Sequence, residues 1–125
     1  MMDISASRKA IEAQQIEKLS RMLKAELPGN AFYRRKLLEK GFSTVDSLAQ
    51  FRKFPYTIKS ELVEDQQAHP PFGTALSFPV DRYVRIHQTS GTSTGHPLHW
   101  LDTPESWEWI IGCWGTNFAL MGLTP

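Results

Sequence analysis

A chain of 125 residues has the length of one small domain, and it is long enough to bury a modest hydrophobic core. Hydrophobic residues make up 41% of the chain and charged residues 22%, which is typical of a globular protein and excludes an intrinsically disordered one. The formal net charge of +1 excludes the strongly basic surface expected of a nucleic-acid-binding or anionic-membrane-binding protein.

The cysteine content and the apolar runs narrow the expected location of the protein. Cys113 is the only cysteine, so no internal disulfide can form, which fits a reducing compartment. No apolar run reaches the length that spans a membrane, because Gly112, Gly115 and Thr116 interrupt the most apolar stretch. The first residues lack the apolar core of a secretory signal. We therefore expect a cytoplasmic protein with no membrane partner.

The chain begins with two predicted helices. Leucines and isoleucines recur at helical spacing across residues 7–26, with charged and amide side chains between them. Pro28 and Gly29 end this first helix. Asn30 is a favourable cap for a second helix, which we expect to continue to Lys40.

Two shorter helices and a linker are predicted next. Ser43 and Asp46 have the spacing of a capping box, which predicts the start of a short third helix. A fourth helix is predicted to begin after Thr57, so that residues 1–68 form a helical part. Two consecutive prolines then predict an extended linker over residues 69–82.

The pattern changes in the second half of the chain. Residues 83–102 alternate in polarity on either side of a small-residue loop, which predicts a strand–loop–strand unit. Thr103 and Pro104 are a strong helix start, and they predict a helix over residues 103–121. The predicted fold class is therefore α/β, with about five helices and one strand–loop–strand unit.

The last predicted helix is apolar on nearly every side. Such a helix is normally enclosed in a larger protein body. One pair of strands cannot cover it, so we expect that the chain begins a longer protein or needs a partner, which includes a possible homodimer.

The loop between the predicted strands contains only glycine, serine and threonine over residues 89–95. Backbone N–H groups and hydroxyls in such a loop can converge on an anion, most often a phosphate. An ordinary mobile hairpin loop fits the same composition equally well. Three residues separate Gly91 from Gly95 and no lysine follows, which excludes the phosphate loop of P-loop NTPases.

A longer stretch of sequence favours the phosphate site over the ordinary hairpin loop. Residues 86–97, IHQTSGTSTGHP, resemble the phosphate-loop motif of AMP-forming acyl and aryl acid–CoA ligases. The likeness is closest to the phenylacetate–CoA ligase branch of this adenylate-forming superfamily. It extends to FYRR at 32–35, FPYTIKSEL at 54–62 and PFG at 71–73, and downstream to the Trp-rich helix, in the order of the family.

The resemblance implies a fold, a reaction and a site. Residues 1–125 would be the N-terminal part of the large AMP-binding domain of a ligase that uses ATP, Mg²⁺ and CoA. A small carboxylic acid of the aryl or arylacetic class would attack the α-phosphate of ATP, and CoA would then displace AMP. The loop would hold the β- and γ-phosphates. The implied phosphate-binding residues are Thr89, Ser90, Gly91, Thr92, Ser93, Thr94, Gly95 and His96.

Two departures from the family pattern concern this loop, and the rest of the active site is expected elsewhere. The family has two residues between the glycines where this chain has three, and a lysine or arginine where this chain has His96. A histidine is only partly charged near neutral pH, so its hold on polyphosphate would be weaker. The resemblance places the remaining catalytic parts beyond residue 125, so we assign no catalytic residue and expect the isolated chain to be inactive.

The histidines have alternative interpretations. His96 and His99 could be a metal pair, but no cysteine or carboxylate cluster accompanies them, so structural roles are favoured and no metal site is predicted. His87 has two open interpretations, as a residue that shapes the loop and as a simple strand residue.

The charged clusters favour ordinary surface positions. Arg35 and Glu39 lie one helical turn apart, which predicts a solvated helix face and not a nucleic-acid site. Glu61, Glu64 and Asp65 have no apolar pocket around them in the sequence, so we expect them to be exposed.

The aromatic helix also has a plainer interpretation. Core packing is favoured over an aromatic-acid pocket for Trp107, Trp109 and Trp114, and Cys113 is expected to be an inert, buried thiol. The alternative to a ligase is a non-catalytic or truncated relative that serves as an anion-binding or interaction module.

Overall fold

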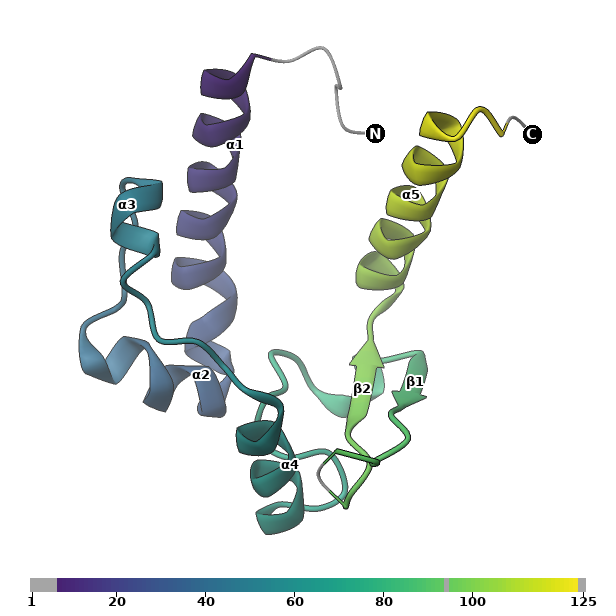
Figure 1. The fold of residues 1–125 in the computed structure, drawn as a ribbon. Helices are drawn as coiled ribbons and strands as arrows, with labels where there is room; N and C mark the ends of the chain where they lie inside the picture. The colour runs from purple at the N-terminus through teal and green to yellow at the C-terminus, as the bar shows by residue number, and fades with distance from the viewer. Residues whose placement is uncertain (1–6, 94, 124–125) are drawn as a thin grey trace.

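The computed structural model describes residues 7–93 and 95–123. Figure 1 shows an open arrangement in which α1 (Arg8–Arg21) and α5 (Pro104–Leu120) stand on opposite sides. Helix α2 (Ala31–Lys36) lies under the lower end of α1, a two-stranded sheet lies under the lower end of α5, and α4 (Lys59–Ala68) lies between these two parts. The short α3 (Leu48–Phe51) lies beside α1. The α/β fold class, with about five helices and a strand–loop–strand unit, is confirmed.

The first helix is less regular than predicted. The Ser7 hydroxyl caps α1 by accepting a hydrogen bond from the Ala10 N–H. The α-helix ends at Arg21, a π-helical turn follows at Met22–Glu26, and a 3-10 turn closes the segment at Leu27–Gly29. The end of the helical segment before Asn30 agrees with the proline–glycine signal, because proline lacks the N–H that a continuing helix needs.

The second and third helices differ from the sequence prediction. Asn30 caps α2 as expected, but the α-helix ends at Lys36 and only a 3-10 turn follows at Leu38–Lys40. The capping box at Ser43 is wrong, because α3 begins after Ser47, whose hydroxyl accepts from the Gln50 N–H. The Gln50 side chain accepts from the Asp46 N–H, which keeps Asp46 outside the helix.

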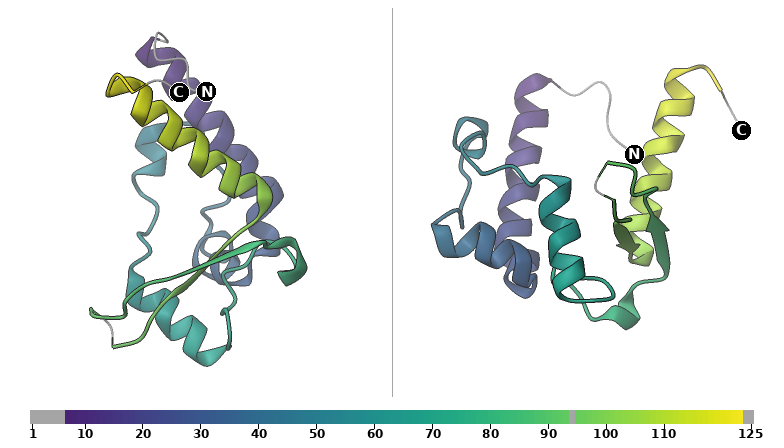
Figure 2. Two further views of the ribbon diagram at one scale, coloured as in Figure 1. Left: turned by 90° about the vertical axis from the view of Figure 1, so that its right-hand side faces the viewer. Right: turned by 60° about the horizontal axis from the view of Figure 1, so that its bottom comes forward.

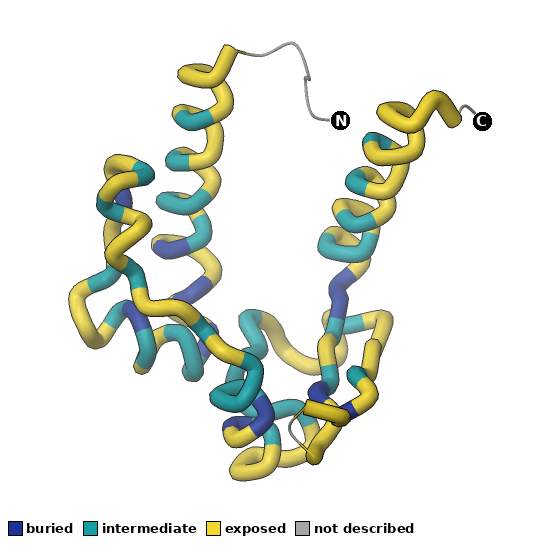
Figure 3. Tube along the Cα trace, viewed as in Figure 1, coloured by how far each residue is buried: buried dark blue, intermediate teal, exposed yellow. Residues whose placement is uncertain are grey.

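The hydrophobic core lies where α1, α2 and the segment before α3 meet. Leu23, Leu27, Leu37 and Val45 are its buried members. Figure 3 shows this burial concentrated at the base of α1, whereas the upper turns of α1 and most of α5 are exposed. The core therefore stabilises the helical part and leaves α5 outside it.

The fourth helix begins after Thr57, as predicted, and a less extended segment follows it. Residues 69–82 contain a turn after α4 and a 3-10 helix at Val80–Arg82, so the prediction of a simply extended linker is wrong there.

The sheet is a hairpin of β1 (Arg85–Gln88) and β2 (His99–Asp102), which pair antiparallel. Thr103 caps α5 through its hydroxyl, which accepts from the Ser106 N–H, and Pro104 is the first helical residue, as predicted. The loop therefore projects from one end of the hairpin and α5 continues from the other.

The apolar residues of α5 are not packed into a core. Trp109 is 63% exposed and Trp114 is 58% exposed, so the core packing favoured for these side chains does not occur among the described residues, as expected for a helix that one pair of strands cannot cover. Cys113 is half-buried rather than buried. Among the described residues, no helix is long and apolar enough to cross a membrane.

Candidate phosphate-binding site

The loop is closed at its base by one further pair of residues beyond the hairpin. The Thr89 N–H donates to the carbonyl of Leu98 over 3.0 Å, and the Leu98 N–H donates to the Thr89 hydroxyl over 2.9 Å. Leu98 is buried, so this pair is anchored in the protein body. Residues 90–97 thus form a separate loop on a fixed base.

Glycine occupies the two positions of the loop, 91 and 95, for different structural reasons. Gly91 is buried, its φ is +74°, and a Cβ there would lie 2.9 Å from the His96 carbonyl carbon and from the Pro97 nitrogen. Gly95 has the same positive φ but open space around its Cα. Only glycine adopts the left-handed backbone without strain, and at Gly91 only glycine also fits.

The described part of the loop carries many hydrogen-bond donors. Ser90, Thr92, Ser93, Gly95 and His96 are exposed, and the Ser90 and Thr92 hydroxyl oxygens lie 3.2 Å apart. Among the backbone N–H groups of residues 89–93 and 95, only that of Thr89 donates a hydrogen bond to another described residue. Thr94 lies outside the described residues. A loop with this many available donors has the chemistry of an anion site.

Helix α4 lies against the loop, a placement that Figure 2 shows in its right-hand view. The Lys59 ammonium nitrogen lies 3.3 Å from the Ser93 hydroxyl oxygen. Near the other end of the helix, the Gln66 side chain donates to the carbonyl of His99 over 2.7 Å and accepts from its N–H over 2.9 Å. Sequence reasoning missed Lys59 and Gln66 because no spacing in the chain indicates that α4 packs beside a loop about 30 residues further on.

An ion pair holds the first turn of α4. Glu61 binds the Lys36 ammonium and accepts from the Ile58 N–H over 2.9 Å. The hydrogen bond from Lys36, followed by the one from Ile58, lowers the pKa of Glu61 below its usual value of 4.5. Glu61 is half-buried in this pair where exposure was expected, while Glu64 is exposed as expected.

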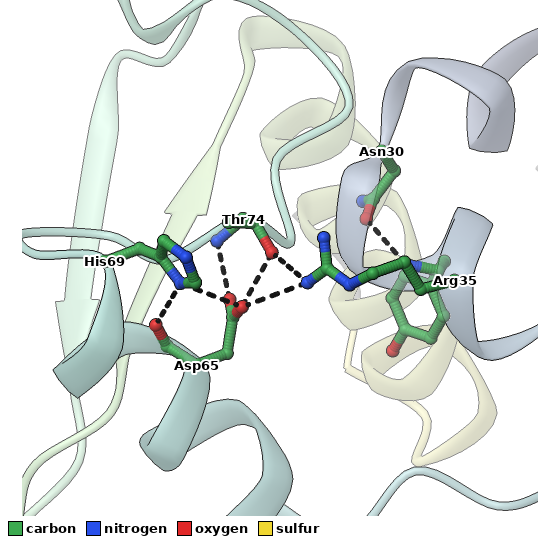
Figure 4. A network of polar contacts seen from close by, with 6 residues as sticks. Asn30, Arg35, Asp65, His69 and Thr74 are labelled. Carbon is green, nitrogen blue, oxygen red and sulfur yellow. Dashed lines mark hydrogen bonds and ion pairs between the residues drawn. The ribbon is translucent and has the colours of Figure 1, made fainter.

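A buried carboxylate holds the second half of α4, as Figure 4 shows. Asp65 accepts from the N–H of Thr74 over 2.5 Å and from its hydroxyl over 2.6 Å, and Arg35 lies 3.5 Å away. A Cβ at Gly73 would lie 2.4 Å from the same carboxylate. Asp65 is thus buried and not exposed, because Arg35 of α2 and Thr74 of the segment after α4 compensate its charge.

The network corrects a second expectation about charges. Arg35 reaches Asp65 and the Thr74 hydroxyl rather than Glu39. The partner of Glu39 is Arg34, at 3.6 Å. The basic residues of α2 are therefore partly engaged in fixing α4.

The three histidines near the loop have distinct surroundings. His87 Nε2 lies 3.1 Å from the buried Asp102 carboxylate, and its ring stacks on Trp107 with 5.4 Å between ring centroids. His87 therefore connects β1 to α5. His99 Nδ1 lies 3.3 Å from the Pro71 carbonyl, which agrees with a structural role. His96 is exposed next to Gly95, and no group of three metal-ligating side chains occurs in residues 7–93 and 95–123.

The amino-acid sequence has relatives among characterised ligases. A phenylacetate–coenzyme A ligase of Escherichia coli (strain K12) is 37% identical over 95 residues, which are 74% of this chain and 20% of that protein. A phenylacetate–coenzyme A ligase of Aromatoleum evansii is 31% identical over 111 residues, which are 85% of this chain and 24% of that protein. No protein-family model matches the chain.

The fold has relatives as well. A crystal structure of 2-hydroxyisobutyryl-CoA ligase in its postadenylation state, with R3-HIB-AMP, matches with a TM-score of 0.75 and 27% identity, over 100% of this chain and 28% of that one. The same enzyme with 2-HIB-AMP and CoA in the thioesterification state matches with a TM-score of 0.73 and 32% identity, over 82% of this chain and 22% of that one.

The chain thus spans about a fifth to a quarter of the length of the curated relatives it matches. The curated relatives and the structural relatives are both named as CoA ligases. Over that share, this chain is similar to the phenylacetate–coenzyme A ligases and to 2-hydroxyisobutyryl-CoA ligase.

Proposed function

We propose that the chain is the N-terminal, phosphate-binding part of an ATP-dependent carboxylic acid–CoA ligase. The complete polypeptide would activate an aryl or arylacetic acid as its adenylate and pass the acyl group to CoA, releasing AMP and pyrophosphate. The chain would act as part of the large AMP-binding domain of a cytoplasmic enzyme. The isolated 125 residues would not catalyse the reaction.

The observation that carries this proposal is the donor-rich loop on its fixed base. The proposed contacts to the β- and γ-phosphates come from Thr89, Ser90, Gly91, Thr92, Ser93, Thr94, Gly95 and His96. Preorganised N–H and hydroxyl donors stabilise the negative charge that accumulates on departing pyrophosphate, and they do so without reorganising during the reaction.

The cofactors fit the chain to different extents. The loop donors suit the phosphates of ATP. The described residues provide no cluster of metal ligands, so Mg²⁺ would enter bound to the triphosphate and not in a site of this segment. CoA binding is proposed for the complete polypeptide, and we assign none of the residues described above to it.

The proposal is tested by acid-dependent ATP–pyrophosphate exchange with the polypeptide of the complete reading frame. The acids should include phenylacetate and benzoate, together with 2-hydroxyisobutyrate, because the curated relatives and the structural relatives are named for different acids. We expect exchange to depend on an aryl or arylacetic acid, and formation of a CoA thioester on addition of CoA.

Two results would contradict the proposal in different ways. Exchange with 2-hydroxyisobutyrate alone would keep the reaction but overturn the aryl substrate class. A polypeptide that binds ATP without exchange for any of these acids would instead favour the non-catalytic module.

A further inference from the structure

Lys59 lies beside the loop with an unneutralised charge. It is the half-buried first residue of α4, and its ammonium nitrogen is 3.3 Å from the Ser93 hydroxyl oxygen. None of the ion pairs in residues 7–93 and 95–123 involves Lys59. The acid in the same helical turn, Glu61, is already bound by Lys36 and the Ile58 N–H. The positive charge of Lys59 is therefore directed at the loop and not at a protein carboxylate.

The position of Lys59 is unfavourable for the helix itself. The N-terminal end of a helix carries a partial positive charge, so a lysine in the first turn is repelled where an acid would be attracted. Since no carboxylate in residues 7–93 and 95–123 pairs with Lys59, the described part of the chain contains no ion pair that offsets this repulsion. A bound anion at the loop would offset it.

Helix α4 holds Lys59 at a fixed place relative to the loop. Gln66 lies seven residues further along, so it is on the same face of the helix as Lys59, and it binds both backbone groups of His99 at the loop exit. Asp65 and Glu61 fix the helix to Thr74, Arg35 and Lys36 on its other sides. The ammonium group is thus preorganised, which limits the entropy lost when it contacts a ligand.

The loop has no permanently charged cation in its own sequence. Residues 89–97 contain no lysine and no arginine. Backbone N–H groups and hydroxyls provide partial charges only, whereas an ammonium group carries a full charge and makes stronger, charge-assisted hydrogen bonds to phosphate oxygens.

We propose that Lys59 is a polyphosphate-binding residue, whose ammonium group contacts the β- or γ-phosphate of ATP in the loop. This inference rests on the function proposed above. In the adenylation step, an oxygen of the acid forms a bond to the α-phosphorus while the bond from that phosphorus to the pyrophosphate oxygen breaks. The bonding electrons stay on the departing pyrophosphate, and Lys59 stabilises that charge without giving up a proton.

The test compares ATP with AMP, which lacks the β- and γ-phosphates. In the complete polypeptide, Lys59→Met should weaken MgATP binding roughly 10- to 100-fold, as expected for loss of a charged hydrogen bond, while AMP binding changes by less than about twofold. In pyrophosphate exchange, the KM for ATP should rise and the KM for the acid should stay the same. Lys59→Arg should keep most of the affinity.

Two controls separate binding from folding. Lys53→Met removes an exposed lysine outside α4 and should leave ATP binding unchanged. The melting temperature of Lys59→Met should equal or exceed that of the wild type, because the substitution removes a cation from the positive end of a helix. If Lys59→Met does not fold, Lys59→Gln permits the same comparison of ATP with AMP.

Several outcomes would overturn the inference. Unchanged ATP affinity in a folded Lys59→Met protein, or equal losses for ATP and AMP, would show that Lys59 does not bind the polyphosphate while the ligase assignment stands. A wild-type polypeptide that does not bind MgATP would overturn the proposed function itself, and that result is visible before any variant is made.

Discussion

At the scale of single residues, the loop depends on glycine for two separable reasons. Gly91 and Gly95 share a φ of +74°, but only Gly91 lies against other backbone atoms. A substitution at Gly95 therefore reports the cost of the left-handed backbone alone, and a substitution at Gly91 reports that cost together with a steric clash. The pair is a matched experiment within one loop.

We predict that Gly91→Ala disrupts the loop more than Gly95→Ala. Each substitution carries about 1–2 kcal/mol for the left-handed conformation, and the new methyl group at Gly91 must also displace His96 and Pro97. In the complete polypeptide, the dissociation constant for MgATP, measured by calorimetry, should increase more for Gly91→Ala. Equal effects of the two substitutions would show that the contact with His96 and Pro97 does not position the loop.

His96 gives the second prediction at this scale. Because a lysine is fully charged near neutral pH and a histidine only partly so, His96→Lys should lower the KM for ATP of the complete polypeptide. Initial-rate measurements of pyrophosphate exchange over a range of ATP concentrations test this, with His99→Gln as a control at a histidine that faces the Pro71 carbonyl. An unchanged or raised KM would place His96 away from the phosphates.

At the scale of elements, α4 is held to α2 by charges that the sequence presents as ordinary surface groups. Helix caps and the α5 start were predictable because they depend on residues one to three positions apart, as at Asn30 and Thr103. The partners of Glu61 and Asp65 were not predictable, since Lys36 and Thr74 are 25 and nine residues away. Local spacing contains no information about which helix faces another.

The Lys36–Glu61 pair predicts an acid-sensitive stability. Because the folded-state pKa of Glu61 lies below 4.5, the pair stabilises the fold above that pH, and this contribution is lost as the pH falls through the lowered value. Lys36→Met should therefore reduce the melting temperature near neutral pH, and this reduction should shrink as the pH falls below 4.5 and Glu61 becomes protonated.

A matched control is available in α1. Arg8→Met breaks the Arg8–Glu12 pair, whose side chains are 81% and 42% exposed, and exposed pairs of this kind contribute little to stability. Differential scanning calorimetry of both variants over the same pH range makes the comparison. A melting temperature of Lys36→Met that follows the wild type at every pH would show that the pair does not stabilise α4.

At the scale of the whole molecule, the helical part has a core and α5 does not. The helix is apolar on nearly every side, as predicted. Trp109 and Trp114 are exposed because the described part of the chain supplies too little surface to cover them. The distinction between a core helix and an exposed one could not be made from periodicity, because both have the same pattern of residues.

We predict that the isolated 125-residue chain self-associates through α5. Its exposed apolar side chains include Trp114, Phe118 and Leu120, and such contiguous patches drive association in water. Static light scattering should give a mass above 14.3 kDa that rises with concentration. Replacing Trp114 and Phe118 by glutamine should reduce association, whereas replacing the exposed Ile11 of α1 in the same way should not. A monodisperse monomer at all concentrations would contradict the prediction.

Because α4 contacts both the tip and the exit of the loop, the loop sequence cannot be transferred to another protein with all of its contacts. A graft that transplants residues 86–97 into another hairpin would carry every amide and hydroxyl described here, yet it would leave behind the lysine and the glutamine that approach from a distant stretch of chain. Sequence searches that use only residues 86–97 will therefore also retrieve proteins that have the loop but lack the helix and its lysine. A search pattern that also requires the helix some 30 positions upstream includes all the parts of the site described above.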